Sequence, residues 1–242
     1  MRNNIYQMNK IKSISLMFPL YKDRNTVRLM IKKSLNVLKK LKIKSEIIIV
    51  DDGCPQKSGN LAKEIAKKYT NIKVFFHKKN LGYGAAIRTG LKRCKHDWIF
   101  FTDGDDENDV NNIFRLLKVR KDHDLIITYR HKKKYSVRRI VISWIYNKIV
   151  RLIFNIKFRD ISNASRLVNK KLIQNIKLKS TSSFIGAELV VSAQLAGYKI
   201  GEIGVIHFSS GRAGSIVSFK NILLTFKDMF LLFVGTFVKR FC

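Results

Sequence analysis

Short apolar segments that alternate with amphipathic ones constrain the fold of this chain more than any other feature. Five apolar segments in the first half are expected to form strands, at residues 14–18, 46–50, 72–76, 98–102 and 125–128. Four segments between them place apolar residues at helical spacing, at residues 25–41, 58–69, 84–93 and 110–118. This alternation predicts an α/β fold with a mostly parallel central sheet flanked by helices.

Acidic residues gather where one of these predicted strands ends. The segment 98–109, with the sequence WIFFTDGDDEND, runs from an apolar strand into five carboxylates: Asp103, Asp105, Asp106, Glu107 and Asp109. The chain as a whole is strongly basic, with a formal net charge of +31. Ligands of parallel sheets bind beyond the carboxyl ends of the strands, so this cluster marks a candidate site.

A divalent cation is the simplest explanation for the acidic cluster. Carboxylate oxygens suit Mg²⁺ or Mn²⁺, and the Asp-x-Asp pair Asp103 and Asp105 is the expected core of such a site. Glu107 is a third candidate ligand. The alternative is the start of the following helix, where acids favour the helix dipole and Asn108 or Asp109 can act as a cap. That alternative explains one or two of the acids well, but not all five.

Two segments in the second half combine apolar and basic residues. They span residues 135–158 and 215–241. The longest uncharged run of the second segment, residues 229–238, has about 10 residues. Because a helix needs roughly 20 apolar residues to span a bilayer, we expect helices that lie in the membrane interface, with core helices as the alternative. The expected organisation is an N-terminal tail over residues 1–12, one domain over 13–214 and a membrane-associated helix over 215–242.

The basic composition narrows the possible partners. It fits nucleic acid, an anionic membrane surface or phosphorylated substrates. The chain lacks the aromatic and basic spacing of an RNA-binding sheet and shows no recognisable groove-reading helix, so nucleic acid is not expected. Its three cysteines lie far apart and no signal peptide is visible at the start. We therefore expect a reducing, cytoplasmic setting without disulfides.

Two further motifs lie next to predicted elements: one follows the strand at residues 46–50, and the other precedes the helix at residues 84–93. The sequence Asp-Asp-Gly at residues 51–53 can bind a base or ribose, although Asp-Gly is also common in turns. Residues 80–84, NLGYG, resemble a dinucleotide fingerprint, but Ile87 stands where the third glycine is required. We expect the glycines instead to let the backbone approach a ligand closely.

Eight motifs occur in a fixed order along the chain. They lie at residues 18–23, 48–53, 80–90, 103–105, 129–130, 160–167, 188–200 and 211–215. With this order the chain resembles the family 2 GT-A glycosyltransferases. It is most similar to their dolichol- and polyprenol-phosphate mannosyltransferase and glucosyltransferase branch. The resemblance covers roughly residues 13–228.

The resemblance implies roles for individual residues. The nucleotide-sugar donor would contact Pro19, Tyr21, Asp23, Asp52, Gly82, Arg88, Asp103 and Glu188. The metal would be held by Asp103, Asp105 and Glu107. The donor and acceptor phosphates would face Arg130, Arg139, Arg166 and Arg212, and the catalytic residues would be Asp105, Arg130 and Arg212.

Several positions depart from the pattern of the family. Cys54 and Glu107 stand where serine and glutamine are usual, and Asn163-Ala164 replaces a usual glycine. The proline expected after the acidic cluster is missing. These departures bear on the sugar and the acceptor more than on the class of reaction.

The expected activity is inverting transfer of a hexose from a nucleotide-diphosphate sugar to a polyprenyl phosphate of the dolichyl type. It would use Mg²⁺ or Mn²⁺ at the inner face of the cytoplasmic membrane. A phosphate acceptor is already anionic and needs orientation, whereas a hydroxyl acceptor needs a base, for which Asp105 or Asp106 is the candidate. The alternatives are extension of a lipid-linked or cell-surface glycan, and an inactive scaffold. A membrane-protein partner or a homo-oligomer is left open.

Overall fold

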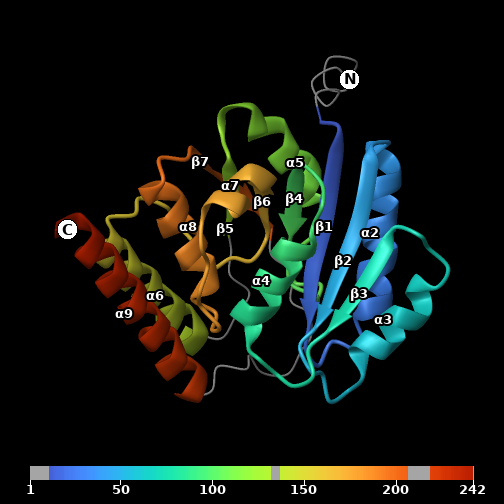
Figure 1. Ribbon diagram of the computed structural model, residues 1–242, viewed down its shortest axis with the longest axis horizontal. Coiled ribbons are helices and arrows are strands. Elements are labelled where there is room, and N and C mark those ends of the chain that lie inside the picture. The colour runs from blue at the N-terminus through green and yellow to red at the C-terminus, as the bar shows by residue number, and fades with distance from the viewer. Residues whose placement is uncertain (1–10, 132–136, 207–218, 242) are drawn as a thin grey trace.

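A seven-stranded sheet forms the centre of the molecule, with helices on both sides (Figure 1). The computed structural model describes residues 11–131, 137–206 and 219–241. The strands are β1 (Ser13–Leu20), β2 (Lys44–Asp51), β3 (Ile72–Phe76), β4 (Trp98–Phe101), β5 (Leu125–Arg130), β6 (Arg166–Asn169) and β7 (Ile200–Val205). The helices are α2 (Val27–Leu41), α3 (Ser58–Ala66), α4 (Tyr83–Arg93), α5 (Asn112–Val119), α6 (Val137–Phe154), α7 (Lys170–Asn175), α8 (Ile185–Leu195) and α9 (Phe219–Phe241).

The strands follow the order β3-β2-β1-β4-β6-β5-β7 across the sheet. Neighbours among β1, β2, β3 and β4 pair in parallel, as do β5 and β7. Strand β6 pairs antiparallel with both β4 and β5. The predicted α/β fold with a mostly parallel sheet is therefore confirmed, and all five predicted strands lie in it.

Strands β6 and β7 are not evident from the sequence. β6 has four residues and begins with the charged Arg166, while β7 contains Gly201 and Glu202. Strands are recognised from runs of apolar, β-branched residues, and neither segment has such a run. Partners on both sides hold β6 in place, so tertiary pairing outweighs its weak local preference.

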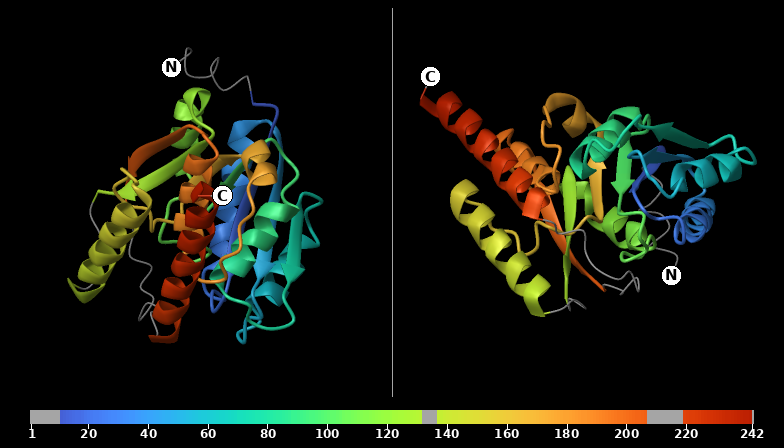
Figure 2. Two further views of the ribbon diagram at one scale, coloured as in Figure 1. Left: turned by 60° about the vertical axis from the view of Figure 1, so that its left-hand side comes forward. Right: turned by 90° about the horizontal axis from the view of Figure 1, so that it is seen from below.

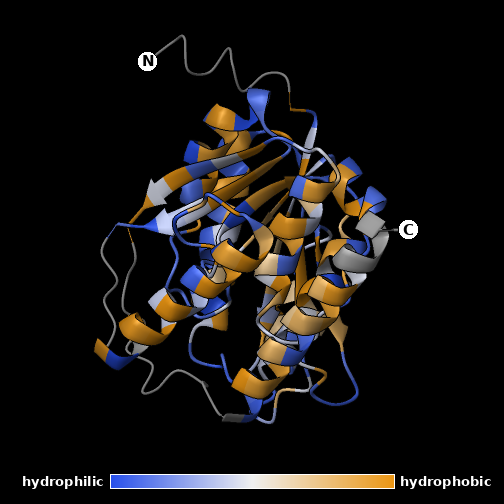
Figure 3. Ribbon diagram, turned by 90° about the vertical axis from the view of Figure 1, so that its left-hand side faces the viewer, coloured by the Kyte–Doolittle hydropathy of each residue, from blue (hydrophilic) through white to orange (hydrophobic). Residues whose placement is uncertain are grey.

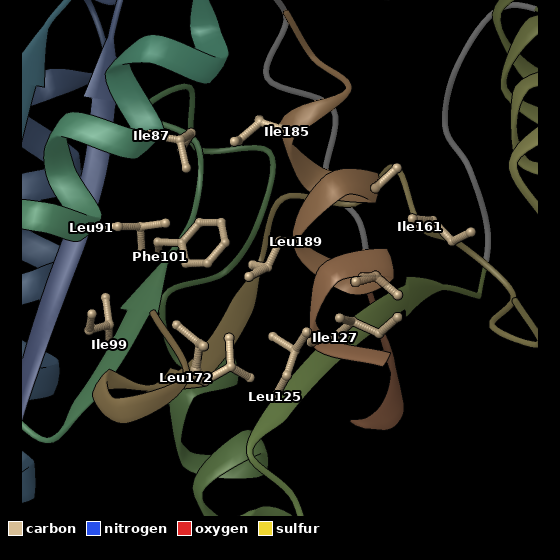
Figure 4. Packing of buried hydrophobic residues seen from close by; sticks show 14 of the residues in the cluster. Ile87, Leu91, Ile99, Phe101, Leu125, Ile127, Ile161, Leu172, Ile185 and Leu189 are labelled. Atoms are coloured by element: carbon tan, nitrogen blue, oxygen red, sulfur yellow. The ribbon is translucent and has the colours of Figure 1, made fainter. Parts of the chain in front are cut away.

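Side chains alternate between the two faces of the sheet and build two cores. On β2, Ile47 belongs to the core covered by α2 and α5, whereas Ile48 belongs to the core covered by α4 and α8. This period of two is that of a strand buried on both faces, which explains why β2 is a continuous apolar run. Figure 4 shows the second core, to which Ile87 of α4, Phe101 of β4 and Leu189 of α8 contribute.

Helices α6 and α9 lie on the α8 side of the sheet and project from it (Figure 2). Val150 of α6 and Met229 of α9 are buried against the core. Large apolar side chains elsewhere on these helices stay exposed, among them Trp144 (56%) and Phe230 (64%). Figure 3 shows the predominance of hydrophobic residues on both helices. The two predicted helices are confirmed, and none of the described helices combines the length and apolar composition that crossing a bilayer requires.

The start of α4 packs tightly against the segment that precedes α8. The backbone N–H of Gly84 donates to the carbonyl of Thr181 at 2.8 Å. A Cβ atom on Gly84 would lie 2.6 Å from the carbonyl oxygens of both Ser180 and Ser182. Gly82, with a φ of +98°, faces the same segment. These glycines therefore let the chain's own backbone approach closely, and the predicted approach of a ligand to them stays a prediction.

Replacing Gly84 with alanine is expected to destabilise the protein by about 1–3 kcal/mol, because the added methyl group would overpack against backbone atoms. The matched control is Gly235→Ala on α9, where a Cβ atom meets nothing within 4 Å. Alanine there should leave stability unchanged or raise it by up to roughly 1 kcal/mol. Thermal unfolding followed by circular dichroism measures both variants, and equal melting temperatures would contradict the packing described.

Candidate functional site

The carboxyl ends of β1, β2 and β4 meet at one edge of the sheet. Leu20 at the end of β1 pairs with Asp51 at the end of β2, and Asp52 donates its backbone N–H to the Leu20 carbonyl at 3.0 Å. Thr26, just before α2, donates its hydroxyl to the carbonyl of Gly104 at 2.7 Å. Three loops that are distant in sequence are thus joined at the edge where parallel sheets bind ligands.

Two carboxylates of the acidic cluster lie at this edge. Asp103 accepts a hydrogen bond from the Tyr83 hydroxyl at 2.8 Å, and Asp105 accepts one from the backbone N–H of Glu107 at 3.0 Å. Burial, together with the charges of Asp103 and Glu107, raises the pKa of Asp105 to about 8. Burial also raises the pKa of Asp103, although the Tyr83 hydrogen bond lowers it. The two acids therefore repel each other where little water can screen them.

This pair of carboxylates fits a divalent cation. Oxygen ligands suit Mg²⁺ and Mn²⁺, and a bound cation would offset the repulsion between Asp103 and Asp105. Within residues 11–131, 137–206 and 219–241, no three His, Cys, Asp or Glu side chains are grouped to hold a metal. The predicted set with Glu107 as a third ligand is therefore not found as a grouped site there, although the charge of Glu107 acts on both Asp103 and Asp105. Two carboxylates suffice where substrate phosphates complete the coordination of the metal.

The other two acids of the cluster have structural partners. Asp106 forms an ion pair with Lys33 of α2 at 2.7 Å. Asp109 accepts a hydrogen bond from the backbone N–H of Asn111 at 2.9 Å, just before α5. The helix-start explanation therefore holds for Asp109. It does not account for Asp103 or Asp105.

Asp52 organises the glycine segment beside the site. Its carboxylate accepts the backbone N–H groups of Leu81 at 2.9 Å and Gly82 at 3.0 Å. His77 places Nδ1 at 2.7 Å from the same carboxylate, and its Nε2 lies 2.9 Å from the hydroxyl of Thr89. Asp52, predicted to contact the base or ribose, thus also fixes the loop between β3 and α4.

The predicted nucleotide-binding loop lies at the end of β1. Asp23 is buried and accepts the backbone N–H of Tyr21 at 2.8 Å, which fixes the turn after the strand. Pro19 lies within β1, and a Cβ atom on Gly104 would be 2.6 Å from its carbonyl oxygen. The structure therefore brings Pro19, Tyr21 and Asp23 to the same edge as Asp103.

Arg130 is held by a bidentate ion pair at the end of β5. Its guanidinium donates to Asp160 at 2.7 and 2.9 Å and to the hydroxyl of Ser162 at 2.8 Å. Both partners belong to the segment before β6. The positive charge of Arg130 lowers the pKa of Asp103, so the guanidinium acts on the acidic pair. Asp160 therefore fixes the orientation of a predicted phosphate-binding arginine.

A cavity of about 190 Å³ adjoins Asp103. Arg166, Ser162 and Asn163 contribute to its polar wall, and apolar residues that include Ile87 of α4, Phe101 of β4 and Leu189 of α8 also line it. Arg166 is 1% exposed and donates to the backbone carbonyls of Ile161, Asn163 and Gly186. Arg166 contributes positive charge to the wall of this cavity, and its predicted contact with an acceptor phosphate stays a prediction.

Glu188 and Arg88 both contact the segment that precedes α8. Glu188 is 2% exposed and accepts the adjacent backbone N–H groups of Lys179 and Ser180, at 2.7 and 2.8 Å. Arg88 of α4 donates to the Leu178 carbonyl at 3.5 Å. Each oxygen of Glu188 thus accepts one backbone N–H group, which fixes the segment before α8; its predicted contact with the donor sugar stays a prediction.

Two predicted arginines cannot be placed, and three unpredicted residues contact the site. The side chain of Arg139, on α6, and the whole of Arg212 lie outside the described residues. Tyr83, His77 and Asp160 each contact a predicted residue. Tyr83 and Asp160 lie within the motifs at residues 80–90 and 160–167, but neither was given a role in the site. His77 gives no signal in the sequence, because its partner Asp52 is distant along the chain.

The sequence matches a known family over most of its length. A family model described as Glycosyl transferase family 2 matches residues 15–177. An undecaprenyl-phosphate 4-deoxy-4-formamido-L-arabinose transferase of Photorhabdus laumondii is 26% identical over 223 residues, which are 91% of this chain and 67% of the relative. The protein of the same name from Pseudomonas savastanoi is 26% identical over 72% of this chain and 53% of the relative. The chain thus spans between about half and two thirds of these relatives' length.

Solved structures share the fold. Glucosyl-3-phosphoglycerate synthase from Mycobacterium tuberculosis, in complex with Mn²⁺, UDP-glucose and phosphoglyceric acid, has a TM-score of 0.68 at 12% identity and covers 96% of this chain and 83% of its own. Its complex with Mn²⁺, UDP and phosphoglyceric acid has a TM-score of 0.65 at 12% identity, covering 88% and 75%. The likeness at this identity concerns the fold alone. With the family match, it confirms the resemblance drawn from the motifs: the chain belongs to glycosyl transferase family 2 and has the GT-A fold.

Proposed function

We propose that this protein transfers a sugar from a nucleotide-diphosphate sugar to a polyprenyl phosphate at the surface of the cytoplasmic membrane, with Mg²⁺ or Mn²⁺ as cofactor. The observation that carries the proposal is the pair Asp103 and Asp105 at the end of β4, next to a cavity of about 190 Å³. The curated relatives act on undecaprenyl phosphate according to their names. The structural neighbours were solved with Mn²⁺ and UDP-glucose or UDP, which supports the same kind of donor.

The residues at the sheet edge would bind and orient both substrates. Asp23 shapes the loop after β1, and Asp52 shapes the loop between β3 and α4; the nucleotide would lie beside these loops. Asp103 and Asp105 would hold the cation, which when bound stabilises the charge that develops on the leaving diphosphate. The sugar would enter the cavity beside Asp103. Arg130, fixed by Asp160, would attract the anionic acceptor, as guanidinium groups bind phosphate well.

The state of the predicted bases favours a phosphate acceptor over a sugar hydroxyl. A polyprenyl phosphate is anionic at neutral pH, so no side chain has to remove its proton, whereas a hydroxyl acceptor requires a general base. Of the two predicted bases, Asp106 is paired with Lys33 and Asp105 would be committed to the cation. This favours lipid phosphate over the extension of a glycan.

The outer surface of α6 and α9 suits a membrane-borne acceptor. Exposed apolar side chains on these helices include Trp144 and Phe230, and Lys148 stacks over the Trp144 ring at 5.0 Å. Apolar residues flanked by cations are typical of helices that lie in the interface of anionic membranes.

The identity of the transferred sugar is less constrained than that of the acceptor. A hexose remains a prediction, because the names of the relatives specify a formamido-arabinose.

Asp105→Asn is expected to stabilise the metal-free protein. The pKa of Asp105 is about 8 in the folded chain, whereas an unfolded aspartate titrates near ~3.9. The folded state therefore holds more protons than the unfolded state between these values, and the free energy of unfolding falls as the pH rises through this range. Asparagine does not ionise, so the variant does not lose this stability as the pH rises. At pH 8 the metal-free variant should melt about 2–4 °C above wild type, the shift that corresponds to roughly 1 kcal/mol.

Mn²⁺ should raise the melting temperature of the wild type, and more at pH 8 than at pH 6, because the cation displaces protons from the carboxylates. Asp105→Asn should not respond. Asp109→Asn is the matched control, since Asp109 bonds to the start of α5 and should leave the response intact. Differential scanning fluorimetry measures all three proteins. Equal responses of wild type and Asp105→Asn would refute the metal assignment.

The purified chain is expected to transfer labelled sugar to undecaprenyl phosphate in anionic vesicles, giving product that extracts into an organic phase. The donor panel should contain nucleotide-linked hexoses and amino- or formamido-pentoses. The double variant Trp144→Ser/Phe230→Ser should lower transfer in vesicles about tenfold or more, because two large apolar anchors are lost. It should leave transfer to a short, water-soluble prenyl phosphate unchanged.

Leu29→Ser is the control for this experiment. Leu29 is also exposed, at 43%, but lies on α2, which packs on the other face of the sheet. Its replacement should change neither reaction. Transfer to soluble oligosaccharides but to no prenyl phosphate would contradict the proposed acceptor and favour glycan extension. Equal activity of the double variant in vesicles would contradict membrane docking through α6 and α9.

A further inference from the structure

The segment before α8 is clamped by carboxylates from two helices. We call residues 179–182 the clamped loop. The backbone N–H groups of its first two residues donate to Glu188 of α8 at 2.7 and 2.8 Å. Those of the last two donate to Asp228 of α9, both at 2.9 Å. Hydrogen bonds to a charged acceptor are roughly twice as strong as neutral ones, so four consecutive bonds of this kind fix the loop.

Asp228 is an unusual residue for its position. It is the one acidic residue of α9, a helix that otherwise carries apolar, polar and basic side chains. A carboxylate on a helix that faces an anionic membrane would be repelled, but Asp228 is half-buried and turned toward the clamped loop. Thr225, one turn earlier, places its hydroxyl 3.1 Å from that of Ser183. Helix α9 is thus attached at two points to the segment that leads into α8 (Figure 1).

The clamped loop in turn supports the start of α4. Its Thr181 carbonyl accepts the backbone N–H of Gly84 at 2.8 Å. The space beside Gly82 and Gly84 is filled by the backbone of the loop, so these glycines cannot move independently of it. Tyr83 lies between the two glycines and donates its hydroxyl to Asp103 at 2.8 Å. A continuous set of contacts therefore runs from α9 to a carboxylate of the proposed metal site.

We propose that Asp228 is a positioning residue that couples α9 to the metal-binding carboxylates through the clamped loop and Tyr83. This role rests on the proposed function, since it requires that Asp103 and Asp105 hold the cation. It assigns a role in the site to α9, which lies outside residues 15–177, the part of the chain that the family model matches. The helix proposed to dock on the membrane would thereby help to set the geometry of the site that handles the donor.

Binding of Mn²⁺ alone to the full chain, followed by electron paramagnetic resonance, tests this coupling. Tyr83→Phe and Asp228→Asn should each weaken Mn²⁺ binding by about tenfold, as expected for groups that orient a metal ligand from outside the coordination sphere. The double variant should bind no more weakly than Tyr83→Phe within about twofold, because both changes act on one path. Lys227→Gln, the exposed neighbour, should match wild type. If Asp228 had a merely structural role, the losses of Mn²⁺ affinity in the two single variants would multiply in the double variant.

Hydrogen exchange measured by mass spectrometry provides a second test, one that does not depend on comparing Mn²⁺ affinities. Coupling is reciprocal, so Mn²⁺ added to the wild type should slow amide exchange in peptides that cover the clamped loop. Asp228→Asn should speed exchange there and in peptides that cover residues 80–86. Unaltered exchange in both comparisons, or wild-type Mn²⁺ affinity in Asp228→Asn, would overturn the proposal. A wild-type chain that binds no Mn²⁺ would instead contradict the proposed function. In that case, unchanged exchange at residues 80–86 in Asp228→Asn would overturn the structural coupling of α9 to α4.

Discussion

The repulsion between Asp103 and Asp105 is the interaction on which the rest of the site depends. Folding brings the two carboxylates together at the end of β4 and removes much of their contact with water, which raises the pKa of both. The surrounding groups offset part of this cost through the Tyr83 hydroxyl and the charge of Arg130. A cation would offset the rest, so binding and stability are linked at this site.

The sheet explains why the compensating groups are available. Parallel strands deliver their carboxyl ends to one edge, so Asp23, Asp52 and Asp103 come from three strands and meet there. Antiparallel β6 then inserts between β4 and β5 and carries the segment of Asp160 to Arg130. Beyond the sheet, α8 and α9 hold the loop on which α4 rests. The acidic pair is thus supported from elements across the whole chain.

The sequence predicted the parts of this arrangement that have a local signal. Apolar runs predicted the first five strands, and helical spacing predicted the helices between them. The acidic cluster pointed to Asp103 and Asp105. Contacts between distant segments left no such signal. The glycines of residues 80–84 were expected to approach a ligand, and nothing local showed that they also approach a loop about a hundred positions later. Arg166 was assigned to a phosphate from the resemblance, and the three backbone carbonyls that hold it in the interior could not be inferred. Asp228 had a signal, as the single acid in a basic and apolar helix, but its partners could not be inferred.

The location of the cation tests the account most directly. Crystals of the full chain grown with Mn²⁺ and a nucleoside diphosphate should show an anomalous scattering peak within coordination distance of both Asp103 and Asp105, and crystals of Asp103→Asn should lack it. Anomalous density at another group of residues, or none beside a clearly bound nucleotide, would contradict the view that Asp103 and Asp105 form a metal site.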